Sequence, residues 1–347
     1  MAHATLATPA SESNTAIAPA CPLCESKMRP WLYVPCDWRR PDSGERFQTY
    51  WCDHCRYGMV YPRPTPAEIA EFYKVEYYTH GQNGAPPPVD PLGERVRTAI
   101  SWRMDRSVEI YPEWFERVIA RRDAKICDLG CGDGRLMKAL VAEGYRDVQG
   151  MEPDPAARAT AAAAGLLVHD GKLEDLPDAI RSHRFDFVFM SHVLEHALDP
   201  VAALRNAGDA AGDDGRVIVD VPNNDAQSLI NRHVCWSWLD IPRHLNFFTV
   251  DSLRRMGAQV GLEAEVVEFY GYNQQFRNKW IGNEQLIWDR LHAADPAAVH
   301  RPRNSVARSW VFMIHSIFLP VTRRYISFRI IFKKAVATPV PAANDRA

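Results

Sequence analysis

The stretch from Ile126 to Gly134, ICDLGCGDG, constrains the fold more than any other part of the chain. An apolar segment and an aspartate precede three glycines on alternate positions, Gly130, Gly132 and Gly134. Glycines let a loop turn sharply, and they let backbone amides approach a ligand without a Cβ in the way. We therefore expect a ligand-binding loop between a strand and a helix.

Short apolar segments alternate with helical segments from Lys125 onward. The predicted strands are KICDL, DVQGME, LLVHD, FDFVFM and RVIVDVP, and the predicted helices cover 134–143, 154–164, 200–210 and 249–258. This alternation predicts an α/β fold with a Rossmann-like, doubly wound and mostly parallel sheet. Sheets of this kind bind ligands at the carboxyl ends of their strands.

The residues around the glycine loop indicate the kind of ligand. The spacing G-x-G-x-G differs from the dinucleotide pattern, and Asp128 would disfavour a pyrophosphate but suit a cationic group. Glu152 follows the second predicted strand and can accept hydrogen bonds from both hydroxyls of a ribose. Gly171 to Leu173 could meet an adenine through main-chain groups. S-adenosylmethionine (SAM) fits this set, and a structural turn or a nicotinamide site is the alternative.

Four motifs in the same order strengthen this interpretation. The stretches ICDLGCGDG, GMEPDP, FDFVFMSHVLEHALDP and LDIPRHLNFFTVDSL resemble those of class I SAM-dependent methyltransferases. The group that modifies surface polysaccharides and small molecules is the most similar one. The resemblance covers about 123–262 and extends forward through CDHCRYGMVYPRPTPAEIAEFY. It implies SAM contacts at Asp128, Gly130, Gly132, Gly134, Glu152, Gly171, Leu173 and Ser191.

Three histidines are candidates for the base that takes a proton from the acceptor. His192 and His196 follow the fourth predicted strand, although Glu195 and His196 could instead satisfy each other or cap a helix. His244 lies in WSWLDIPRHLNFFT, which in the family it resembles commonly forms the lid over the acceptor. Its aromatic side chains could wall an acceptor site or belong to the core, and Arg243 could bind an anion or pair with an acid such as Asp240.

Two Cys-x-x-Cys pairs, with 27 residues between them, predict a structural zinc site. The four ligands are Cys21, Cys24, Cys52 and Cys55. A zinc module can also bind RNA, but the arginines and acids of this module are balanced, which weakens that interpretation.

The remaining features concern location. The chain of 347 residues has a formal net charge of -2 and begins with an Ala/Thr/Ser/Pro stretch that lacks the features of a signal peptide. A cytoplasmic protein with reduced cysteines is expected. Residues 301–334 carry eight Lys or Arg and no acid around the apolar run from Trp310 to Val321. This segment could contact the inner face of a membrane, or cover the catalytic domain or a second subunit.

These features divide the chain into five parts. They are a disordered tail (1–20), a zinc-binding module (21–62), a helical connector (63–122), a methyltransferase domain (123–272) and a helical, basic and apolar C-terminal segment (273–347). We expect methyl transfer to a small molecule or a sugar, including a lipid-linked glycan. An RNA methyltransferase and a non-catalytic scaffold that binds SAM and zinc are the alternatives, with nucleic acid the less favoured partner. The sequence does not indicate the acceptor atom or the oligomeric state.

Overall fold

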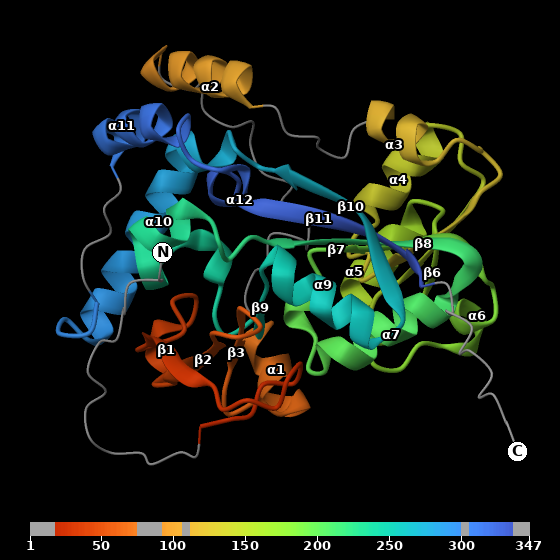
Figure 1. The fold of residues 1–347 in the computed structure, drawn as a ribbon, viewed down its shortest axis with the longest axis horizontal. Coiled ribbons are helices and arrows are strands. Elements are labelled where there is room, and N and C mark those ends of the chain that lie inside the picture. The colour runs from red at the N-terminus through yellow and green to blue at the C-terminus, as the bar shows by residue number, and fades with distance from the viewer. Residues whose placement is uncertain (1–17, 75–91, 106–111, 300–304, 336–347) are drawn as a thin grey trace, which may run out of the picture.

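The computed structural model describes residues 18–74, 92–105, 112–299 and 305–335, and within these residues the strands form two sheets (Figure 1). The larger sheet has seven strands and the smaller sheet has four. Most of the predicted disordered tail lies outside the described residues. Its last residues do not, because Ala20 pairs with Lys27 and Met28 donates to the carbonyl of Pro19. The ordered N-terminal module therefore begins before Cys21.

The larger sheet has the strand order β10-β11-β8-β7-β4-β5-β6. Strand β4 is parallel to β5 and β7, and the outer strands β6 and β8 continue the parallel part, whereas β11 is antiparallel to both of its neighbours. The parallel strands are β4 (Lys125–Leu129), β5 (Asp147–Met151), β6 (Leu167–His169), β7 (Phe185–Ser191) and β8 (Ala211–Pro222). All five overlap the predicted strands, and the predicted Rossmann-like α/β fold is confirmed.

The helices between these strands begin where the sequence offers caps. Asp154 and Asp199 accept hydrogen bonds from backbone N–H groups in the first turns of α5 and α7, and a proline follows each of them. Thr249 and Ser252 form a reciprocal cap at the start of α9. The bounds are α4 (Arg135–Ala142), α5 (Pro155–Ala163), α6 (Asp178–Arg181), α7 (Pro200–Ala210) and α9 (Val250–Gln259).

The C-terminal part of the chain differs from its prediction. Strand β11 (Ser327–Lys334) inserts between β8 and β10 (Leu262–Tyr270), so the segment 273–347 is not entirely helical and the sheet does not end at 272. Residues 327–332 are buried, and Arg329 is fully buried against Asp220 of β8 at 2.8 Å. The stretch from 327 to 334 therefore belongs to the domain core and is not part of a membrane-facing segment.

The smaller sheet joins the N-terminal module to the catalytic domain. Its strands are β1 (Arg29–Val34), β2 (Phe47–Cys52), β3 (Tyr57–Val60) and β9 (Asn246–Phe247). Strand β9 belongs to the segment that carries His244, and it pairs with β3 through Gly58 and Met59. The module predicted at 21–62 thus does not stand alone, because its sheet is completed from the other part of the chain.

Helices cover the remaining surfaces. Helices α10 and α11 precede β11, with α2 beside α11 at one edge of the molecule (Figure 1). The bounds are α1 (Pro66–Phe72), α2 (Leu92–Met104), α3 (Pro112–Val118), α8 (Gln227–Arg232), α10 (Asn278–Ala294), α11 (Val306–Ser316) and α12 (Val321–Arg324). The predicted connector thus contains three helices in its described residues.

Candidate active site

The glycine loop connects β4 to α4 at the carboxyl edge of the parallel strands. Gly130, Gly132 and Gly134 all have positive φ, between 55° and 77°. A Cβ on Gly130 would lie 2.5 Å from a methyl carbon of Val193, whereas a Cβ on Gly132 would meet no atom within 4 Å. The backbone at Gly132 therefore faces open space and is accessible to a ligand.

Buried acids surround this loop. Asp128 is 3% exposed, and burial together with the carboxylates of Glu152 and Asp220 raises its pKa to about 7. A carboxyl group with a raised pKa near other acids is one whose negative charge is poorly compensated. A cationic group placed here would relieve that repulsion, so the donor set fits the positively charged end of SAM.

Glu152 lies beside the loop in a fixed orientation. One of its carboxylate oxygens accepts from the N–H of Gly132 at 2.9 Å, and the other accepts from the N–H of Asp154 at 2.9 Å. Each carboxylate oxygen has two lone pairs, so these bonds leave acceptor capacity for the hydroxyls of a ribose. The two backbone donors hold the carboxylate at the carboxyl end of β5.

The loop after β6 brings Gly171 and Leu173 to the same edge of the sheet. A Cβ on Gly171 would lie 2.7 Å from Met151 Sδ and 2.7 Å from Pro177 Cδ, so this position requires glycine. Leu173 packs against the core, and its carbonyl accepts from the side chain of Asn206 at 2.9 Å. The loop that would meet the adenine is thus held in place at Gly171 and at Leu173.

Ser191 ends β7, on the other side of the glycine loop, and His192 directly follows it. His192 has φ of +54°, a left-handed conformation that a non-glycine residue seldom adopts. Its Nδ1 lies 3.3 Å from Glu195 Oε1, and its Nε2 lies 2.8 Å from the hydroxyl of Tyr270 on β10. A carboxylate only accepts, so Nδ1 of His192 carries a proton and donates to Glu195. Strain at an observed outlier of this kind is typical of functional sites.

His196 and His244 meet edge to face, with ring centroids 4.7 Å apart. His196 Nδ1 lies 3.0 Å from the carbonyl of Arg243, and His244 Nδ1 lies 2.8 Å from the carbonyl of Trp238. Since a carbonyl only accepts, Nδ1 of His244 donates, and the neutral ring of His244 keeps a lone pair on Nε2. Burial and the neighbouring His196 lower the pKa of His244 to about 4, so His244 is neutral at pH 7.

Glu195 lies beneath these histidines and is 1% exposed. Burial opposes its ionisation, but the hydrogen bond from His192 and the nearby imidazoles bring its pKa below the usual value. Its Oε2 has no hydrogen-bond partner within the described part of the chain. Ligand atoms of Glu195, His196 and His244 all lie within 4.8 Å of one another. The cluster could therefore move a proton or bind a cation.

The segment around His244 differs from the prediction of an aromatic wall. Trp236, Phe247 and Phe248 are at most 1% exposed and belong to the core. Trp238 stays at the site, where its ring stacks on His192 at 4.8 Å. Arg243 is fully buried and paired with Asp37 and Asp240, so the pairing alternative holds and this arginine is not open to an anion.

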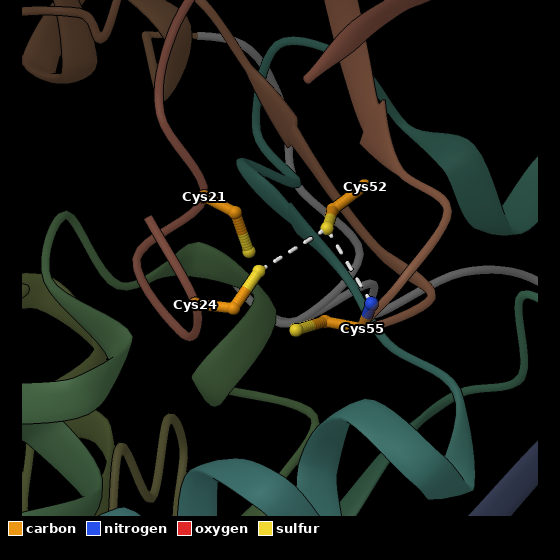
Figure 2. Close-up of side chains that lie close together, drawn as sticks. All are labelled: Cys21, Cys24, Cys52 and Cys55. Carbon is orange, nitrogen blue, oxygen red and sulfur yellow. Dashed lines mark hydrogen bonds between the residues drawn. The ribbon is translucent and has the colours of Figure 1, made fainter. Parts of the chain in front are cut away.

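The four predicted zinc ligands come together on two turns, and Figure 2 shows their sulfurs facing one another. One ligand atom from each of Cys21, Cys24, Cys52 and Cys55 lies within 4.8 Å of the others, and the Sγ atoms of Cys24 and Cys52 are 3.6 Å apart. All four are free thiols. This donor set fits a tetrahedral metal site.

Three residues near the site were not predicted from the sequence: two tyrosines that contact His192 and His196, and one acid near Asp128. Tyr270 contacts His192, and the hydroxyl of Tyr73, at the end of α1, lies 2.9 Å from His196 Nδ1. Asp220 contributes to the field at Asp128. Of these three, only Asp220 could have been recognised from the sequence, because it is the one acid inside the apolar stretch RVIVDVP.

Comparison with known proteins agrees with this arrangement. Residues 103–267 match the family described as "Methyltransferase domain". A ubiquinone biosynthesis O-methyltransferase of Azorhizobium caulinodans is 36% identical over 30% of this chain and 43% of its own length, so the chain spans less than half of that relative. A tRNA U34 carboxymethyltransferase of Aliarcobacter butzleri is 23% identical over 56% of this chain and 70% of its own length.

Solved structures include a SAM-dependent methyltransferase from Archaeoglobus fulgidus, with 16% identity and a TM-score of 0.42 over 69% of this chain and 94% of that one. The family match covers the five parallel strands of the larger sheet, β4 to β8, whereas the antiparallel strand β11 beside β8 lies outside the matched residues. The chain therefore has the Rossmann-like α/β fold of class I methyltransferases, and residues 103–267 match a methyltransferase domain.

Proposed function

We propose that the protein transfers the methyl group of SAM to a small molecule or a sugar, including a lipid-linked glycan. The observation that carries this proposal is the open backbone at Gly132 next to the buried Asp128 and the half-buried Glu152. Uncompensated negative charge beside bare backbone suits a ligand with a cationic end and hydroxyl groups. SAM has both features.

The cofactor contacts follow from the carboxyl edge of the sheet. Asp128 and the glycine loop would hold the methionine part of SAM, and Glu152 would accept from the ribose hydroxyls. Main-chain groups near Gly171 and Leu173 would meet the adenine, with Ser191 on the other side of the loop. Bound SAM supplies a methyl group on a positively charged sulfur, which an acceptor atom attacks in line. Positioning of the two reactants then supplies much of the rate.

His244 is the proposed base. Its Nδ1 donates to the Trp238 carbonyl, so the lone pair on Nε2 is available for a proton from the acceptor. The ionised carboxylate of Glu195 attracts the imidazolium that forms, which offsets the cost of a buried charge. His196 and His192 adjoin the same carboxylate and are proposed as supporting groups.

Two features support a compact polar acceptor. The ring of Trp238 covers His192, and its indole N–H has no acceptor among the described residues. An aromatic face beside an unpartnered donor suits a sugar or a ring that carries hydroxyl groups.

The arginines of the N-terminal module argue against RNA as the acceptor. Arg39 pairs with Asp240, Arg40 with Asp37 and Arg56 with Asp225. Binding of phosphates requires cations that are free to release counterions, and these three are already neutralised. The tRNA-modifying relative keeps RNA as the second candidate.

We further propose that the four-cysteine cluster holds a structural zinc ion. A closed set of four thiolates leaves no open position for chemistry, and metal binding would supply folding free energy to the small sheet. All eight cysteines are free thiols, which supports a reducing, cytoplasmic location.

Calorimetry with SAM and S-adenosylhomocysteine tests the cofactor site, and labelled SAM with a panel of sugars, lipid-linked glycans, phenols and tRNA tests the acceptor. We expect SAM binding and label transfer to a sugar or a small molecule. No binding of either nucleoside would overturn the cofactor proposal. If the protein binds SAM and transfers the methyl group only to tRNA, it is an RNA methyltransferase. Tight SAM binding without transfer to any acceptor would support the scaffold alternative.

A further inference from the structure

We propose that α11, the turn that follows it and α2 form a surface that contacts an anionic membrane. We name this region the α2–α11 surface. Most of the large exposed apolar side chains of the described residues lie on it, including Leu92 and Val96 of α2 and Val311, Ile314, Ile317 and Phe318 at α11. Contiguous exposed apolar side chains at this density mark an interaction site.

Helix α11 is fixed to the domain by one face and exposes the other. The hydroxyls of Tyr272 and Ser316 are 2.7 Å apart, and Met313 is 2% exposed. On the opposite face, Val311 and Ile314 are 68% and 61% exposed, and Phe318, in the turn after the helix, is 82% exposed. A spacing of three residues places Val311 and Ile314 on one side of the helix. The apolar stripe is thus held rigidly and faces outward.

Basic side chains border the stripe. Helices α11 and α12 contribute Arg308 and Arg323, and α2 contributes Arg95 and Arg103, and among the described residues none of these four has an ion-pair partner. The segment 305–326 contains no aspartate or glutamate. Arg324 does not join this group, because it donates to the carbonyls of Ser316 and Ile317. An apolar stripe edged by arginines matches an anionic lipid surface.

The charges also distinguish a membrane from a second copy of the chain. A twofold interface brings a surface against itself, so Arg308 and Arg323 would meet other arginines with no acid in the segment to pair with them. Anionic headgroups supply the missing negative charge. None of the described helices is long and apolar enough to span a bilayer. The contact we propose is therefore made at the interface.

A short stretch of the chain connects the α2–α11 surface to the proposed active site. Tyr270 contacts His192, and Tyr272, two residues later, contacts α11. Helix α2 is held beside α11, with the guanidinium of Arg97 6.0 Å from the centre of the Trp310 ring (Figure 1). Membrane contact would thus hold one wall of the site near the lipid headgroups.

Flotation of the full-length protein with vesicles tests the proposal without any need for activity. Vesicles of phosphatidylglycerol and phosphatidylcholine should bind the protein at about 0.1 M salt, and vesicles of phosphatidylcholine alone should bind it far less. The double variant Arg308→Gln/Arg323→Gln should bind roughly 30-fold more weakly, since each arginine near an anionic surface contributes about 1 kcal/mol. The affinity of Val311→Ser/Phe318→Ser for these vesicles should fall at least tenfold, because the variant loses apolar area that the lipid would bury.

Matched controls keep the test specific. Arg254→Gln/Arg255→Gln and Val141→Ser/Leu167→Ser change exposed residues elsewhere and should bind as the wild type does. Failure of the wild type to bind anionic vesicles overturns the proposal, and so does equal loss in the controls. A dimer in analytical ultracentrifugation that Val311→Ser/Phe318→Ser converts to a monomer, without vesicle binding by either form, would instead assign the surface to a second copy.

Discussion

Arg243 donates to both carboxylate oxygens of Asp37, at 2.7 and 3.0 Å, and neither side chain reaches solvent. Asp37 belongs to the N-terminal module, and Arg243 directly precedes the proposed base, His244. The same arginine contacts Asp240, which also accepts from Arg39. The position of His244 therefore depends on a buried ion pair with the N-terminal module.

Loss of this ion pair should destabilise the protein strongly. Asp37→Asn removes one of the two carboxylates that pair with the buried guanidinium of Arg243, and we expect the free energy of unfolding in urea to fall by about 3–5 kcal/mol. Glu116→Gln is the matched control, because the pair of Glu116 with Arg122 is exposed and should contribute less than about 1 kcal/mol. Equal losses in the two variants would contradict the structural role of the buried pair.

The raised pKa of Asp128 should make the stability of the ligand-free protein depend on pH. The unfolded chain ionises this carboxyl near pH 4, whereas the folded protein keeps it protonated up to about pH 7. Stability should therefore decrease as the pH rises from about 4 to 7, by up to about 1.4 kcal/mol per pH unit relative to Asp128→Asn. Urea titrations of both proteins across this range measure the difference. Parallel curves would contradict it.

The same carboxyl should couple SAM binding to a proton. A bound cation favours the ionised form of Asp128, so binding below about pH 7 should release a proton and strengthen as the pH rises. Calorimetry in buffers of different ionisation enthalpy detects that release. Asp128→Asn should bind SAM more weakly and without release of this proton. Proton release that persists in the variant would point to another group.

Replacement of His244 should slow the reaction without loss of the cofactor. His244→Gln removes the proposed base, and general-base catalysis is worth about 10²- to 10⁴-fold in kcat. The dissociation constant for SAM should change little. His315→Gln, which replaces an exposed histidine of α11, serves as the control. A His244 variant with unchanged turnover would exclude the base role.

Metal removal should loosen the N-terminal module. We expect one zinc ion per chain by elemental analysis, and a chelator or Cys52→Ser should release it and lower the melting temperature. Cys36→Ser is the matched control, since the Cys36 thiol lies 3.8 Å from the carbonyl of Arg290 and outside the cluster. A zinc-free protein of unchanged stability would contradict the proposed structural role.

Local patterns in the sequence were enough to predict the parallel sheet. Strand β4 and helix α7 have the predicted bounds, because apolar runs, capping residues and prolines act within a few positions. The glycine loop and the Cys-x-x-Cys pairs are likewise local, and the structure brings the four cysteines together.

Contacts between residues that are far apart in the sequence decided the remaining features of the fold and the site. The sequence by itself determined the five parallel strands, the glycine loop and the pairs of cysteines, because each is encoded within a short stretch. Only the tertiary structure decided that ISFRIIF inserts beside β8, since a buried charge such as Arg329 is stable only next to Asp220, more than a hundred positions away. Likewise, only folding brings Tyr73, Tyr270 and β3 to the segment around His196 and His244, because burial of polar groups depends on partners from elsewhere in the chain.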